Sequence, residues 1–222
     1  MSLDIFIQQL FSQEALWAVL GGYGLGSIPF GLVFTAVAGL GDVRRIGSGN
    51  IGATNVLRTG RRGLAAATLL ADGAKGAVAT GLAYLFLGGG LIVALTALAA
   101  LIGHVFPLWL RFRGGKGVAT NLGITFVLTW PTAIIACLVW LLIFYRWRIS
   151  SVAGMASALV TAPIAWGLSL SPWHPSTSAG TPLFAVLALS AVIVVLRHKD
   201  NLVRLYHGTE PTSSKPPKDK PP

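Results

Sequence analysis

Long apolar stretches alternate along the chain with short segments rich in arginine, lysine and glycine. Seven of these stretches have the length or hydrophobicity expected of membrane spans. They cover residues 14–38, 63–87, 91–110, 118–130, 131–145, 151–170 and 182–196. The fourth is short, and Pro131 separates it from the fifth. The pattern predicts an all-α membrane protein with seven transmembrane helices.

The distribution of basic residues supports this count. Apart from Lys75, every lysine and arginine follows the first, third, fifth or seventh span. The opposite loops are Gly88–Gly90, the turn at Trp130-Pro131 and residues 171–181, and they contain neither residue. The positive-inside rule then places the N-terminus outside and the C-terminus in the cytoplasm, with every basic loop facing the cytoplasm.

Composition excludes several other classes of protein. The 222 residues are 54% hydrophobic and 11% charged, whereas a soluble domain has about 25% charged residues. The net charge of +10 is better explained by cytoplasmic loops and anionic lipids or substrates than by nucleic acid. The single Cys137 excludes an intrachain disulfide and a cysteine metal cluster. Histidines and acidic residues are too few and scattered to predict a metal site.

The chain divides into one membrane domain and a tail. The first residues have no basic region and no small-residue cleavage site, so we expect a retained span instead of a signal peptide. Residues 1–208 are expected to form a single polytopic domain. Residues 209–222 are rich in proline and lysine and are expected to be disordered.

The first basic loop is suited to bind an anion. Glycines let backbone N–H groups converge on an anion, and arginine supplies fixed charge for phosphate. The polar and charged side chains of this loop are Ser48, Asn50, Thr54, Asn55 and Arg58. The pattern Gly47-x-Gly49-x-x-Gly52 matches the dinucleotide-binding motif, but no buried strand precedes it and no αβ pattern follows.

The second basic loop, Gly114-Gly115-Lys116-Gly117, resembles a nucleotide-binding P-loop only superficially. The earlier glycine would fall at Leu110, and Gly117 replaces the magnesium-binding Ser or Thr. Two interpretations stay open: a second phosphate cradle, or a positive-inside anchor with flexible glycines.

Four further residues lie in or beside the spans, and each has two possible roles. Lys75 lies deep in the second span, where a lone lysine costs about 2.5–3.5 kcal/mol. Asp72, three residues earlier, can pair with it on the same helical face. The pair either joins two helices or supports a site. His104 and His198 are each either structural or part of a site, and no serine lies in a nucleophile elbow.

Four segments together resemble the bacterial acyl-phosphate:glycerol-3-phosphate acyltransferases. They are Ser48–Val56, Asp72–Gly76, His104–Pro107 with Phe112–Gly117, and Arg197-His198-x-x-Asn201. The resemblance covers residues 20–210 and implies a seven-helix enzyme of the plasma (inner) membrane. The implied reaction joins a fatty acyl group from acyl phosphate to glycerol-3-phosphate, giving 1-acyl-glycerol-3-phosphate, the first committed step of phospholipid synthesis. It implies no cofactor, and a separate soluble enzyme as the source of acyl phosphate. One departure is Arg113, where the family often has lysine.

The resemblance also implies roles for individual residues. The residues for phosphate and oxyanion contacts or catalysis are Ser48, Asn50, Arg58, Lys116 and His198. Those for substrate binding or for support of the site are Gly49, Thr54, Asn55, Lys75, His104, Gly114, Gly115, Ser150, Ser151 and Asn201. The general base is either a histidine or a substrate phosphate oxygen. We favour the phosphate, because no histidine is obviously paired with an orienting carboxylate.

Two other classes of protein share some of these features. A transporter for organic phosphates would also have basic loops and broken helices, but it predicts inverted repeats and a midplane site. The sequence has no such repeat, and its basic residues gather on one side. A structural membrane scaffold would explain the topology but not the two glycine-rich basic loops.

Overall fold

The computed structural model describes residues 12–88, 90–170 and 180–212. Every regular element in these ranges is a helix. The longer α-helices are α2 (Gln13–Gly26), α5 (Arg62–Leu87), α6 (Leu91–Val105), α7 (Val118–Leu128), α8 (Trp130–Trp147), α9 (Ser150–Leu159) and α11 (Gly180–Arg197). The shorter elements are α3 (Phe30–Val37), η1 (Val43–Arg45), α4 (Ala53–Leu57), η2 (Leu108–Leu110), α10 (Thr161–Ser169) and α12 (Lys199–Tyr206).

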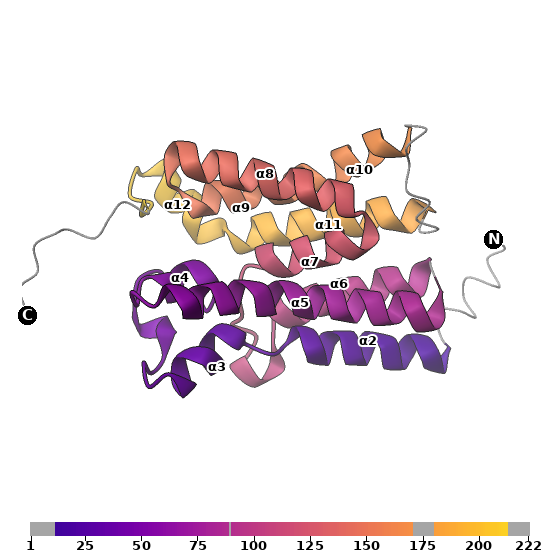
Figure 1. The fold of residues 1–222 in the computed structure, drawn as a ribbon, viewed down its shortest axis with the longest axis horizontal. Helices are drawn as coiled ribbons and strands as arrows, with labels where there is room; N and C mark the ends of the chain where they lie inside the picture. The colour runs from indigo at the N-terminus through magenta and orange to yellow at the C-terminus, as the bar shows by residue number, and fades with distance from the viewer. Residues whose placement is uncertain (1–11, 89, 171–179, 213–222) are drawn as a thin grey trace, which may run out of the picture.

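The long helices run along one axis of an elongated bundle (Figure 1). Helices α2, α5 and α6 form one side, helices α8 to α11 form the other, and α7 lies between them. Helix α7 contacts α5, α8, α9, α11 and α6. The short helices α4 and α12, which are distant in sequence, both lie at the same end of the bundle. Polar segments from both halves of the chain therefore meet at this end.

Most predicted spans correspond to one helix, and proline explains the exceptions. The division of residues 118–145 is confirmed, because α7 ends at Leu128 and α8 begins at Trp130 with Pro131 in its first turn. The first predicted span is two helices, α2 and α3, with a bend of 41° at Pro29. The sixth is also two, since α9 ends at Leu159 and α10 contains Pro163 in its first turn. Proline has no N–H to continue the hydrogen-bond ladder.

In the described residues, three helical stretches are long and apolar enough to cross a membrane. They are Leu91–Leu110, which is α6 followed by η2, Trp130–Trp147, which is α8, and Ser150–Ser169, which is α9 followed by α10. The bent pair of α2 and α3 makes a fourth, while α7 and Leu183–Arg197 are apolar but shorter. The all-helical membrane class is thus confirmed. The count of seven spans and the orientation stay predictions.

Glycines set how closely the helices approach one another. A Cβ atom at Gly123 of α7 would overlap the carbonyl oxygen of Gly73, and one at Gly76 of α5 would overlap that of Thr120. The Thr120 hydroxyl donates to the Asp72 carbonyl oxygen at 2.9 Å, also between α5 and α7. Small residues at membrane helix interfaces allow such backbone contact. This contact fixes where α7 begins relative to α5.

Candidate active site

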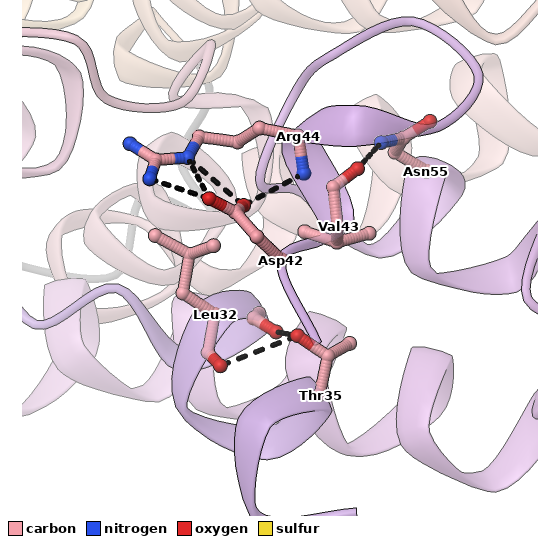
Figure 2. Close-up of polar contacts among 7 residues, drawn as sticks. Leu32, Thr35, Asp42, Val43, Arg44 and Asn55 are labelled. Carbon is pink, nitrogen blue, oxygen red and sulfur yellow. Dashed lines mark hydrogen bonds and ion pairs between the residues drawn. The ribbon is translucent and has the colours of Figure 1, made fainter. Parts of the chain in front are cut away.

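Asn55 holds the first basic loop in shape. Its side-chain nitrogen donates to the Val43 carbonyl oxygen at 2.8 Å (Figure 2) and to that of Asn50 at 2.8 Å. Its oxygen accepts from the Ser48 N–H at 3.0 Å. These bonds use both the nitrogen and the oxygen of a buried side-chain amide. The structure therefore favours a role for Asn55 in supporting the loop, one of the two roles that the resemblance allowed.

Asn50 and Gly47 shape the rest of this loop. The Asn50 side-chain oxygen accepts from the Gly52 N–H at 2.9 Å, immediately before α4. Gly47 has a φ of 55°, and a Cβ there would lie 2.6 Å from Cδ of Arg58. Glycine is therefore required at position 47 for Arg58 to pack across the loop.

The arginines near this loop have different environments. Arg44 forms a hydrogen-bonded ion pair with Asp42, with Nη2 2.6 Å from Oδ2 (Figure 2). The hydrogen bonds from Arg44 lower the pKa of Asp42 to about 2, so the pair is ionised at neutral pH. Arg58, in contrast, lines the cavity described below. Of these two cations, Arg58 is therefore the one available to an anion in the cavity.

The second basic loop packs directly against the end of α6. The Gly114 N–H donates to the Val105 carbonyl oxygen at 3.1 Å, and the Gly115 N–H donates to that of His104 at 3.0 Å. A Cβ at Gly115 would overlap Nε2 of His104. The two glycines are thus required by backbone packing, which places Lys116 at the cavity. Burial lowers the pKa of Lys116 to about 8.

Asp72, Lys75 and His104 form a buried polar cluster beneath the loops. Nζ of Lys75 lies 3.0 Å from Oδ1 of Asp72 and donates to the Ile28 carbonyl oxygen at 2.8 Å. Nδ1 of His104 lies 3.7 Å from the same Asp72 oxygen. His104 therefore faces the Asp72 carboxylate, but this distance is too long for a hydrogen bond, so the expectation that no histidine is obviously paired with an orienting carboxylate stays a prediction. Asp72 and Lys75 belong to α5 and His104 to the last turn of α6, so the packing of α5 against α6 brings the three residues together.

The third group of polar residues comes from α9, α12 and the segment after α12. Nδ1 of His198 lies 2.7 Å from the Val194 carbonyl oxygen, and this geometry assigns the proton to Nδ1. Burial lowers the pKa of His198 to about 4, so its imidazole is neutral at pH 7. Oε1 of Glu210 accepts from Ser151 and from Asn201, at 2.6 Å each.

Glu210 also accepts from Nε of Arg204 at 2.8 Å. Burial by itself would raise the pKa of Glu210, but the hydrogen bonds from Ser151, Asn201 and Arg204 outweigh burial and lower it. The sequence assigns Glu210 to a disordered tail, whereas the structure places its carboxylate against α9 and α12. Residues 213–222 of that predicted tail lie outside the described residues.

These three groups surround one cavity of about 240 Å³. The predicted site residues on its wall are Ser48, Asn50, Thr54, Asn55, Arg58, His104, Lys116, Ser150, Ser151, His198 and Asn201. Gly49, Lys75, Gly114 and Gly115 do not line it: Lys75 faces Asp72 and Ile28, and the other three shape the loops. The structure therefore does not support direct contact between these four residues and a substrate. It does support a role for them in holding the site in shape.

Arg204 and Glu210 line the same cavity, but the sequence reasoning gave neither a role. The spacing His198-x-x-Asn201-x-x-Arg204 offered a signal for Arg204, since residues three apart share a helical face. Glu210 follows the helix and has no such periodicity. Its position depends on how the chain turns back after α12.

Other residues that line the cavity are apolar. Leu69 comes from α5, Leu122 from α7, and Trp140 and Leu141 from α8. Leu141 is also 51% exposed. The cavity therefore joins a cationic, hydrogen-bonding side to a side suited to hydrocarbon, and it can hold an amphiphile with an anionic head.

Comparison with known proteins agrees with this geometry. A family profile described as glycerol-3-phosphate acyltransferase matches residues 16–208. The glycerol-3-phosphate acyltransferase of Caulobacter vibrioides (strain NA1000 / CB15N) is 47% identical over 208 residues, covering 92% of this chain and 91% of the relative. That of Gluconobacter oxydans (strain 621H) is 50% identical over 203 residues, covering 90% and 94%.

Solved structures show the same fold. The crystal structure of PlsY (YgiH), an integral membrane glycerol 3-phosphate acyltransferase, in its glycerol 3-phosphate form, aligns with a TM-score of 0.81 at 32% identity. The alignment covers 90% of this chain and 96% of that one. The lysophosphatidic acid form aligns with a TM-score of 0.80 at 31% identity.

Proposed function

The chain belongs to the glycerol-3-phosphate acyltransferase family, and we propose that its acyl donor is a fatty acyl phosphate. The acyl group passes to the C1 hydroxyl of sn-glycerol-3-phosphate, giving 1-acyl-glycerol-3-phosphate and inorganic phosphate. One observation carries this proposal: a single cavity is bounded by two cationic loops, with Arg58 in one and Lys116 in the other, and by an apolar wall. The two phosphate groups of this substrate pair need cationic surroundings, and the acyl chain needs apolar ones.

The polar wall suggests how the substrates divide between the loops. Ser48, Asn50, Arg58 and Lys116 are assigned to phosphate and oxyanion contacts. His198, Asn201, Ser150 and Ser151 are assigned to glycerol-3-phosphate. Arginine offers paired donors for phosphate oxygens, and hydroxyl and amide groups complete the hydrogen bonding. The acyl chain extends along Leu122, Trp140 and Leu141 toward the membrane.

Acyl transfer from this donor depends more on positioning the two substrates than on a strong general acid or base. Acyl phosphate is a mixed anhydride, so its phosphate leaves readily. The glycerol oxygen attacks the acyl carbon, an oxyanion forms, and the carbon–oxygen bond to phosphate breaks. Cationic and N–H groups at fixed positions stabilise the developing charge.

The proton of the attacking hydroxyl is transferred to an oxygen of the acyl phosphate itself. His198 is a weak base, because its pKa is about 4 and its Nδ1 proton is held by Val194. His104 faces Asp72 and is the alternative base. We expect His104→Ala and His198→Ala to retain measurable turnover; abolished turnover with intact substrate binding would assign the proton transfer to that histidine instead.

The same proposal includes the membrane in which the enzyme lies and its orientation there. Seven spans with the N-terminus outside put both loops and α12 at the cytoplasmic face of a bacterial inner membrane. There the cavity can take glycerol-3-phosphate from the cytosol and acyl phosphate from the soluble enzyme that makes it. Support comes from α4 and α12 lying at one end of the bundle (Figure 1), since basic residues follow α4 and belong to α12.

The decisive assay uses the purified protein with labelled glycerol-3-phosphate and palmitoyl phosphate. We expect lysophosphatidate and inorganic phosphate in equal amounts. The matched control replaces palmitoyl phosphate by palmitoyl-CoA, with which we expect no product. Product from the thioester alone would refute the proposed donor. Glycerol-3-phosphate flux into liposomes without any product would indicate a transporter.

A further inference from the structure

Arg197, the last residue of α11, contacts the second basic loop from outside the cavity. Its Nη2 donates to the Gly114 carbonyl oxygen at 3.3 Å, and its Nε donates to that of Gly115 at 3.4 Å. Its guanidinium also lies over the ring of Phe106, 5.2 Å from the centroid. Arg197 does not line the cavity, and no catalytic or binding role has been assigned to it above. Two contacts of this side chain thus hold the loop whose lysine lines the cavity, and the third holds the guanidinium against the end of α6.

These contacts determine which way the next peptide group faces. A trans peptide is planar, so the Gly115 carbonyl and the Lys116 N–H point in opposite directions. Since Arg197 holds the Gly115 oxygen on its own side, the Lys116 N–H is turned to the other side. In the described part of the chain, no acceptor is found for the N–H groups of Lys116 and Gly117. Both residues line the cavity.

The loop is also held from the side of α6. The Gly114 and Gly115 N–H groups are bonded to the end of α6, and His104 fills the space beside Gly115. The Gly114–Gly115 peptide is thus held at both its N–H and its carbonyl, and the Gly115–Lys116 peptide is held at its carbonyl by Arg197. Glycine by itself would leave these planes free to rotate.

We propose that Arg197 is a positioning residue that orients the Lys116 amide N–H as a hydrogen-bond donor to an anionic oxygen in the cavity. This inference rests on the proposed acyl transfer, in which that oxygen belongs to a phosphate or to the tetrahedral intermediate. Arginine is needed because its rigid fork reaches two carbonyls at once and stacks on Phe106. Lysine keeps the charge but has neither property.

The test is the kinetics of Arg197→Lys, with Arg146→Lys as the matched control. Arg146 lies in the last turn of a spanning helix and stacks on an aromatic ring, Trp147, at 5.7 Å. Losing one oxyanion donor typically lowers kcat about 100- to 1,000-fold, so we expect partial misorientation in R197K to lower kcat by at least about 10-fold. The KM for glycerol-3-phosphate should change by less than about 3-fold, and R146K should match wild type. A kcat of R197K within about 2-fold of wild type would overturn the proposal.

A second readout does not depend on turnover. In wild type, inorganic phosphate should slow hydrogen exchange at the Lys116 amide, and in R197K this protection should be lost. Phosphate protection retained in R197K would overturn the proposal even if the variant were less stable. Wild type could make no lysophosphatidate and yet show phosphate protection that R197K lacks. In that case the acyl-transfer proposal would fail, while the orienting role of Arg197 would stand.

Discussion

At the scale of single residues, Lys116 gives the site a charge that depends on pH. Burial lowers its pKa to about 8, against an ordinary lysine value of 10.5. Its ammonium charge is therefore lost as the pH rises through 8. We expect kcat/KM for glycerol-3-phosphate to fall about tenfold per pH unit well above this pKa, measured in detergent with a correction for spontaneous acyl phosphate hydrolysis.

Stability should move in the opposite direction. An unfolded lysine keeps its proton to about pH 10.4. Between about pH 8 and that value, the unfolded state therefore binds more protons than the folded state. In this window the contribution of Lys116 to the free energy of unfolding rises as the pH rises. Deprotonation of Lys116 by itself therefore does not destabilise the fold in this window. Lys116→Arg should abolish the alkaline decline, because arginine stays charged; an unchanged decline in that variant would exclude Lys116 as its cause.

Arg58 and Arg44 make a matched pair for testing the first loop. Arg58 lines the cavity, whereas Arg44 is neutralised by Asp42. A hydrogen bond to a charged group contributes about 1.5–3 kcal/mol, which corresponds to about 10- to 100-fold. We expect Arg58→Ala to raise the KM of one substrate by that factor, and Arg44→Ala to change both KM values little. Equal kinetics for wild type and Arg58→Ala would remove Arg58 from the site.

At the scale of elements, the contact between α5 and α7 fixes the start of α7 and hence the second loop. A methyl group at Gly123 would overlap the Gly73 carbonyl, whereas one at Gly63 of α5 would meet nothing within 4 Å. We expect Gly123→Ala to destabilise the protein by about 1–3 kcal/mol, as overpacking does, and to lower activity. Gly63→Ala should be neutral or slightly stabilising. Thermal unfolding in detergent measures both; equal unfolding temperatures would mean that the two helices can separate without cost.

At the scale of the whole molecule, the orientation in the membrane is the prediction to test. With Cys137→Ala as background, Arg61→Cys marks the end of the bundle with the basic loops and Leu170→Cys marks the far end of α10. Both positions are exposed. An impermeant maleimide applied to intact cells should label position 170 only, and position 61 only after lysis. The reverse pattern would place the active site outside.

The sequence determined the all-helical membrane class, most helix positions and the places of the two glycine-rich basic loops, because hydrophobic length, proline and glycine act locally. It also indicated Asp72 with Lys75, since residues three apart share a helical face. The separation of basic from uncharged loops predicted one face for the chemistry. These inferences need no knowledge of which helix packs against which.

Tertiary structure decided which of these residues share the cavity. Arg44 and Arg58 flank the same loop, but only the fold pairs one with Asp42 and turns the other inward. Glu210 meets Ser151 across 59 residues of chain, and Arg197 reaches Gly114 across 83. Contacts at such separations depend on helix packing and on turns after α11 and α12, for which local sequence patterns contain no signal.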